Sequence, residues 1–353
     1  MVCVMPSDAI GWALWLGLGA ITLTLLQLLY ILLLRGWLWL MERRRQRLWQ
    51  LWRPLCMNAA CGLAPSVPPL YLSNSNWQFF FRLWHHYLLN VGGEAPDNLQ
   101  RLGRSMGLHH IVIKILNRAP ADQELIAATV TAGWLRDIRA WEPLLQRLHD
   151  EDPVRSFSAA RALTRIDTRS ALREVIPLLV THPDWSRHLV AGLLLEAGPV
   201  MVSPPLLNAI LNTSQEQVTA LVRYLPFADV STTNIVLHRY MFTGQNHELL
   251  CACLKAACSP KVLFLVRNCL SDAHWEVRVE AANALCRLGD GSDVVSLQPL
   301  LSDQQWWVRY RSAQAIGELL HRDKAKMTFI HQAQTDRYAA DMMAQVMAEW
   351  EMA

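Results

Sequence analysis

Two stretches near the C-terminal end share one pattern and decide the fold. Leu270–Leu285 reads LSDAHWEVRVEAANAL, and Leu301–Ile316 reads LSDQQWWVRYRSAQAI. The second stretch follows the first by 31 residues, and the two align without a gap. A period of roughly 20 to 50 residues is the signature of an architecture built by stacking copies of one unit. The sequence therefore predicts an array of repeats.

The same frame occurs twice more upstream. Asp152–Leu163 reads DPVRSFSAARAL, and Asp184–Leu195 reads DWSRHLVAGLLL. Weaker copies lie near Val218–Leu225 and Asn246–Leu254. Each unit reads as an amphipathic helix, a Gly or Pro break, a second apolar helix and a polar turn. One hairpin cannot bury its apolar face alone, so we expect stacked hairpins with a continuous core, an all-α solenoid.

The units resemble the short bacterial HEAT-like repeats of the phycobilin-lyase type, whose signature is W/D-x-V-R-x-x-A-A-x-A-L-x-x-L-G. Trp275–Gly289 follows this signature almost fully, Asp152–Leu163 follows it well, and Pro199–Ser259 follows it weakly. The resemblance implies an α-solenoid over residues 96–335 that binds proteins, and it supplies no catalytic residue. The signatures of the tetratricopeptide and ankyrin repeats are absent from the sequence.

An arginine occupies the same place in each of the four clearer copies, after a turn that carries aspartate. We expect these arginines to form a ladder of ion pairs and carbonyl contacts along the stack. The alternative is a row that binds an anionic ligand. The repeated arginines are Arg155, Arg187, Arg278 and Arg309.

The repeat also predicts how the helices pack. Small residues at Ala281, Ala282 and Ala313 are expected where neighbouring helices cross, with Leu285 and Ile316 in the core.

The N-terminal region contains a long apolar segment. Ala9–Leu34 holds 26 residues without a charge. As a helix it would extend about 39 Å, against roughly 30 Å of bilayer hydrocarbon, so it predicts a membrane-spanning helix. A cleavable signal peptide is the competing interpretation, but it needs a basic start, a shorter apolar core and a small-residue cleavage site. The sequence shows none of these.

Arginines and tryptophans alternate after the apolar segment and predict its orientation. Residues 1–60 carry six arginines, all after Leu34, against two acids; this local charge of +4 leaves −1 for the rest of the chain, whose total is +3. The positive-inside rule places the C-terminal domain in the cytosol and residues 1–8 in the periplasm of a bacterial inner membrane. The expected interfacial residues, which would also contact lipid headgroups, are Arg35, Trp37, Trp39, Arg43, Arg44, Arg45, Arg47, Trp49 and Trp52.

An uncharged segment and an aromatic run follow. Residues 54–81 carry no charge, and four prolines (Pro54, Pro65, Pro68 and Pro69) predict that no continuous helix crosses the segment. The aromatic run has two interpretations: a buried cap on the solenoid, or a docking surface for an integral membrane protein. The candidate docking residues are Trp77, Phe79, Phe80, Phe81 and Trp84.

The predicted organisation has five parts: a tail (1–8), an anchor (9–41), a linker with a cap helix (42–95), the solenoid (96–335) and a C-terminal capping helix (336–353).

We expect no catalytic residue, cofactor or metal, because the common phosphate-binding, hydrolase and zinc motifs are absent. His247 and Cys251 share a helical face, but Cys251 takes the packing position of Ala282. The eight cysteines form no C-x-x-C pair and read as reduced core residues. Lipidation of Cys3 is disfavoured by its predicted periplasmic side.

These patterns predict a membrane-tethered, protein-binding scaffold at the cytosolic face of the inner membrane. The nearly neutral remainder of the chain argues against nucleic-acid binding. The layout resembles HEAT-repeat proteins found beside membrane glycosyltransferases in exopolysaccharide loci, which suggests an accessory role to such a complex. The alternatives are a lyase-like enzyme of the HEAT-like family, acting on a prosthetic group or a protein, and a signalling relay through the short N-terminal tail.

Overall fold

The protein is helical throughout the part that its structure describes. A computed structural model describes residues 7–63, 76–118, 122–242 and 246–352, and no strand occurs in these ranges. The helices form two compact units, Met1–Asp137 and Ile138–Ala353. The predicted all-α class, with stacked helical hairpins, is confirmed. The boundary between the units falls inside the range predicted as solenoid, because the first hairpins pack with the N-terminal helix.

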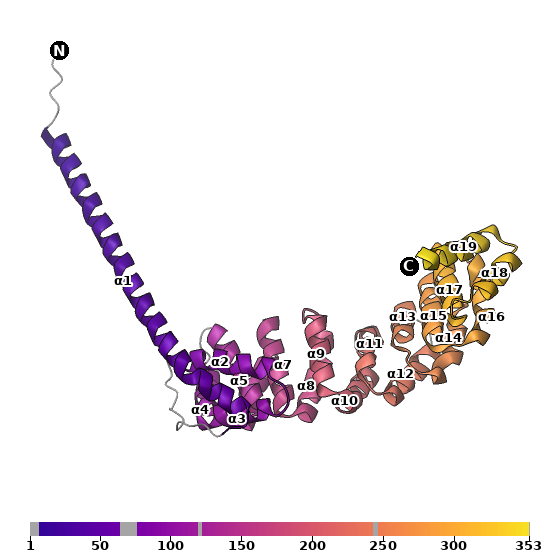
Figure 1. Cartoon of the computed structure of the whole chain (residues 1–353), viewed down its shortest axis with the longest axis horizontal. Coiled ribbons are helices and arrows are strands. Elements are labelled where there is room, and N and C mark those ends of the chain that lie inside the picture. Colours follow the sequence, from indigo (N-terminus) through magenta and orange to yellow (C-terminus); the bar gives the residue numbers. More distant parts are fainter. Residues whose placement is uncertain (1–6, 64–75, 119–121, 243–245, 353) are drawn as a thin grey trace, which may run out of the picture. The chain divides into compact units, whose positions relative to one another are not determined.

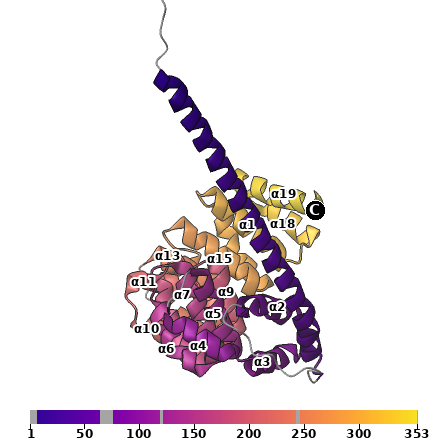
Figure 2. The same cartoon turned by 90° about the vertical axis from the view of Figure 1, so that its left-hand side faces the viewer.

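The first unit is built around one very long helix, α1 (Ser7–Ala60, 54 residues). Figures 1 and 2 show that the first half of α1 extends freely, whereas its last turns lie beside α2 and α3. The helix is long and apolar enough to cross a membrane, and its most apolar window is not buried. The remaining helices are α2 (Trp77–Asn90), α3 (Ala95–Ser105), α4 (Leu108–Arg118) and α5 (Asp122–Leu135).

The prediction that no continuous helix crosses residues 54–81 is confirmed, because α1 ends at Ala60 and α2 begins at Trp77. Pro54 itself lies inside α1. The missing N–H leaves the carbonyl of Gln50 without its usual partner. Gln50 and Pro54 are both exposed, so water can satisfy that carbonyl. The other three prolines of the segment and Cys3 lie outside the described residues.

Aromatic side chains form the core of the first unit. Phe80 and Trp84 are completely buried, and Trp77 is 1% exposed. Trp52 of α1 meets Phe80 edge to face, with ring centroids 5.4 Å apart. A Cβ at Gly103 of α3 would lie 3.1 Å from the Trp84 ring, a tight contact that glycine avoids. The end of α1 is thereby fixed against α2 and α3.

The second unit stacks its hairpins into two rows (Figure 1). One row contains α7 (Pro153–Ile166), α9 (Arg187–Ala197), α11 (Gln215–Val222), α13 (His247–Ala256), α15 (Trp275–Leu288) and α17 (Trp306–Leu319). The other contains α8 (Thr168–Thr181), α10 (Pro199–Asn212), α12 (Val230–Phe242), α14 (Leu263–Cys269) and the short α16 (Val294–Leu297). Helix α6 (Trp141–Leu148) precedes the rows, and α18 (Lys324–Ala333) and α19 (Arg337–Met352) follow them.

The alanines that recur in the repeat explain how neighbouring helices of a row pack together. Ala281, Ala282 and Ala313 are fully buried where α15 meets α17, and Leu285 and Ile316 fill the core beside them. Small side chains let two helix backbones approach closely, and large ones fill the space that remains.

Gly289, which ends the repeat signature, stands where there is no room for a side chain. A Cβ at Gly289 would lie 2.7 Å from the carbonyl oxygen of Leu285 and 2.6 Å from the Asp293 carboxylate. Asp293 is 2% exposed and accepts a hydrogen bond from Arg267 Nε at 2.6 Å. The chain can therefore turn tightly from α15 into the next helix only over a glycine.

Aspartates cap several helices of the second unit. Asp167 accepts hydrogen bonds from the amides of Arg169 and Ser170 at the start of α8. Asp323 does the same for Ala325 and Lys326 at the start of α18. Hydrogen bonds, chiefly from the Ser170 side chain, hold the pKa of Asp167 below its usual value. The amide of Lys326 lowers the pKa of Asp323 in the same way.

We expect these two caps to make the second unit acid-sensitive. A folded-state pKa below the unfolded value stabilises the fold above the unfolded pKa, and this stability is lost as the pH falls through and below about 4. In the double variant Asp167→Asn/Asp323→Asn, the unfolding temperature should fall less between pH 5 and pH 3 than in the wild type. Asparagine retains the cap without titrating. An unchanged pH dependence would contradict the assignment.

Candidate interaction site

The repeated arginines were the first candidate site, and Arg278 has the most contacts among them. Its guanidinium donates to both carboxylate oxygens of Asp303, at 2.8 and 2.9 Å. It also donates to the backbone carbonyls of Asp272 and Ala273, at 2.8 and 3.1 Å. Asp272 belongs to the turn before α15, and Asp303 to the turn of the next repeat. Arg278 therefore joins two consecutive repeats.

Arg309 repeats half of this arrangement. Its Nη1 donates to the carbonyls of Asp303 and Gln304, at 2.8 and 3.2 Å, as Arg278 does to its own turn. No further copy follows with an aspartate, and the guanidinium instead lies 5.5 Å from the ring of Tyr338 in α19. The last repeat is thus closed by a cation–π contact.

The two upstream arginines differ. Arg155 lies 3.5 Å from the Asp150 carboxylate and 3.7 Å from that of Asp152, within its own turn. Arg187 is exposed and is the first residue of α9, whereas Arg278 and Arg309 are the fourth residues of their helices. Arg187 thus stands three positions earlier in its helix than Arg278 and Arg309, which contact their own turns. The expected ladder therefore does not include Arg187.

Most of the predicted interfacial residues on α1 are exposed, but one of them is buried. Trp37, Trp39 and Trp49 are 57%, 53% and 47% exposed, and the Arg43 guanidinium lies 3.8 Å from the Trp39 ring centroid. Arg35 and Arg47 are exposed as well, and the side chains of Arg44 and Arg45 are not described. Trp52 corrects the prediction: it is 4% exposed because it packs on Phe80 and is not available to a headgroup layer.

The candidate docking residues are mostly internal. Trp77, Phe80, Phe81 and Trp84 are buried within the first unit, and Trp84 Nε1 donates to the Leu99 carbonyl at 2.7 Å. A partner cannot contact side chains that the chain itself buries, so the docking prediction is corrected for these four. Phe79 is half-buried. It borders a small cleft of about 110 Å³ whose other lining residues are Trp49, Trp52, Arg82 and Leu83.

A groove in the second unit was not predicted from the sequence. It has a volume of about 790 Å³ and lies along α13 and α15. Its charged lining is balanced, and Lys255 pairs with Glu280 at 3.2 Å. The available signal was the pair Glu248 and Glu276, each the second residue of its helix. The charged residues are Arg187, Arg223, Lys255, Glu248, Glu276 and Glu280.

His247 and Cys251 both line this groove, as their shared helical face implies. His247 stacks on His274, with ring centroids 4.7 Å apart. Burial raises the pKa of Cys251 to about 11 and that of its neighbour Cys253 to about 12. Both are therefore neutral thiols near pH 7, and thiolate is the form that attacks substrates and binds metals. Within the described ranges, no three His, Cys, Asp or Glu residues are grouped to hold a metal ion.

Comparison with known proteins agrees with the repeat architecture. A family model described as HEAT repeats matches residues 248–345. None of the curated proteins compared with the chain matches it. Among solved structures, the chain is similar to a designed armadillo repeat protein, YIII(Dq)4CqI, at 18% identity and a TM-score of 0.23. That match covers 59% of this chain and 98% of the other.

A second similar structure is an engineered protein from the Northeast Structural Genomics Consortium. It is 16% identical, with a TM-score of 0.21, and the match covers 77% of this chain and 96% of the other. With TM-scores this low, the two similarities indicate nothing about function. The class defined by the sequence match and by the fold is a helical repeat scaffold, which fits a role in protein interaction.

Proposed function

We propose that the protein is a scaffold tethered to the bacterial inner membrane, whose repeats hold a protein partner at the cytosolic face. One observation carries the proposal: a single helix, α1, has a bare apolar first half and last turns that pack into the first unit. The helix therefore has a segment suited to lipid that continues directly into folded protein.

The apolar half of α1 supports the tether. From Gly17 to Leu34 every described side chain is exposed, and most are leucine or isoleucine. An apolar surface of this extent is rare on a soluble protein, and lipid is the solvent that would cover it. After this segment come Trp37 and Trp39, and the Arg43 guanidinium lies over the Trp39 ring. Residues of these types are enriched at the interface between bilayer hydrocarbon and water.

The orientation is tested with reporters. A periplasm-active reporter fused after Ala353 should give no signal, whereas a cytosol-active reporter at the same position should be active. The full chain should also remain in the membrane fraction after alkaline carbonate extraction. Periplasmic activity of the C-terminal fusion would overturn the orientation, and extraction by carbonate would overturn the span.

We propose further that the partner is an integral membrane protein, and that the system is accessory to a membrane glycosyltransferase or an exopolysaccharide synthesis complex. Tethering confines the repeats and a membrane partner to the same layer, which raises their effective concentration. Because the aromatic run is internal, the contact with the partner is assigned to the exposed surface of the repeats.

The proposed role is non-catalytic. The repeats are assigned to the short bacterial type found in phycobilin lyases, and only their architecture is carried over. The Cys251 thiol in the α13–α15 groove is neutral near pH 7, because its pKa is raised to about 11, and the charges of the groove are balanced. These features suit a binding surface better than a nucleophilic site.

A further inference from the structure

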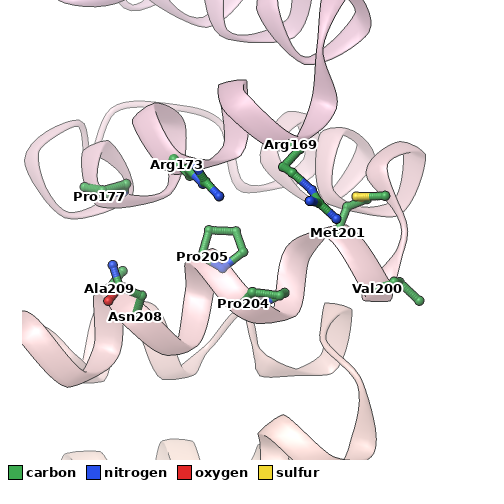
Figure 3. Close-up of a pocket in the computed structure, with 9 residues that line it drawn as sticks. All are labelled: Arg169, Arg173, Pro177, Val200, Met201, Pro204, Pro205, Asn208 and Ala209. Atoms are coloured by element: carbon green, nitrogen blue, oxygen red, sulfur yellow. The ribbon is translucent and has the colours of Figure 1, made fainter.

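A second groove lies on the opposite row of helices, between α8 and α10. Its volume is about 550 Å³. Arg169 and Arg173 line it from α8, and Figure 3 shows both guanidinium groups extending toward α10, where Pro204 and Pro205 face them. Both arginines are exposed.

The charge of this groove is one-sided. No acidic residue is among its described lining. Asp167, the cap of α8, interacts with the charge of Arg169, but it does not line the groove and its oxygen already accepts two backbone amides. The α13–α15 groove, in contrast, offsets its cations with three glutamates. The α8–α10 groove is therefore the better site for an anionic partner.

Prolines remove backbone N–H donors from both helices that form the groove. Pro177, Pro204 and Pro205 stand inside their helices, and none can donate to the carbonyl four residues earlier. Those carbonyls belong to Arg173, Val200 and Met201, which themselves line the groove. The groove thus offers guanidinium donors on one wall, and on both walls it has backbone carbonyls that lack their usual helical partner. An extended peptide carries the matching groups, because its amides lack partners.

The spacing defines the peptide further. Arg169 and Arg173 are four residues apart on α8, a rise of about 6 Å along the helix. In an extended chain, residues two apart point to the same side and lie about 6.6 Å apart. Two acidic side chains in an acidic-x-acidic segment would therefore meet the two arginines. The residue between them points the other way, toward the apolar wall of Val200, Met201 and Pro204.

We propose that the α8–α10 groove binds an extended segment of the protein partner in which two acidic residues flank an apolar one. Arg169 and Arg173 pair with the carboxylates, and the carbonyls freed by proline accept amides of the bound segment. This inference rests on the proposed scaffold function and names the chemistry of its partner.

The test measures fluorescence anisotropy of a labelled peptide, GSGELEGSG, with the full chain in detergent. We expect saturable binding that weakens with salt. Affinity should fall at least tenfold in Arg169→Gln/Arg173→Gln, and less in the corresponding lysine variant, because lysine keeps the charge without the bidentate geometry. The matched control, Arg187→Gln/Arg223→Gln, removes two arginines from the balanced groove and should leave binding unchanged.

Three results would overturn the proposal. They are absence of binding to the wild type, equal binding of GSGQLQGSG or of the respaced GSGEELGSG, and displacement by inorganic phosphate at matched ionic strength, which would indicate a general anion site. Recovery of a membrane partner by the full chain separates the two proposals. If the double variant recovers that partner fully, the scaffold proposal stands and the groove is not the site.

Discussion

Replacing Trp84 by alanine should destabilise the first unit by about 4 kcal/mol. The indole is fully buried, its N–H bonds the Leu99 carbonyl, and its ring covers Gly103. The change leaves a large cavity and removes a buried donor. Hydrogen–deuterium exchange of the full chain in detergent should show faster exchange across α2 to α5.

A matched control separates a structural role from a docking role. Trp49→Ala removes an equally large side chain that is 47% exposed, so the exchange of α2 to α5 should change little. Trp84→Phe keeps most of the volume and loses the N–H, and should have an intermediate effect. If Trp84→Ala abolished recovery of a membrane partner without changing exchange, the tryptophan would be a docking residue and the cap interpretation would fail.

Replacing Arg278 by alanine should have the next largest effect, a loss of about 3 kcal/mol from the second unit. Arg278 and Asp303 are 16% and 10% exposed at their side chains, so the variant leaves a nearly buried carboxylate without its cation. It also removes a donor from two turn carbonyls. The unfolding temperature of the full chain, followed by circular dichroism in detergent, should fall by several degrees.

The repeat supplies the control for Arg278. Arg187→Ala changes the arginine at the corresponding place of an earlier copy, where the side chain is exposed at the start of α9. Its unfolding temperature should stay close to that of the wild type. If Arg278→Ala leaves the unfolding temperature unchanged and abolishes partner recovery, the arginine row is a ligand site.

The repeat could be predicted from the sequence because its physical requirements recur at a fixed interval. Ala281 and Ala282 must be small where helices cross, and Gly289 must lack a Cβ where the chain turns. Each requirement leaves a residue type at a fixed position, and α15 and α17 follow that pattern closely. The long apolar helix at the start of α1 could also be predicted, because an uninterrupted run of uncharged, apolar residues is visible directly in the sequence.

Other features depend on contacts between distant segments. Trp52 and Phe80 lie on separate helices, and nothing local to Trp52 distinguishes it from the exposed Trp49. Arg187 matches the repeat in sequence, yet its helix begins later than the pattern suggests. The α8–α10 groove joins an arginine pair to a proline pair about 30 residues later, and neither pair is informative alone.

Asp303 has a mechanical consequence. Its carboxylate accepts from Arg278 of the preceding repeat and from the Gln305 amide of its own, and its carbonyl accepts from Arg309. A force that extends the array cannot separate α15 from α17 without breaking the two hydrogen bonds from Arg278 to Asp303, which its own turn holds in place. The last two repeats should therefore yield together as one stiff element.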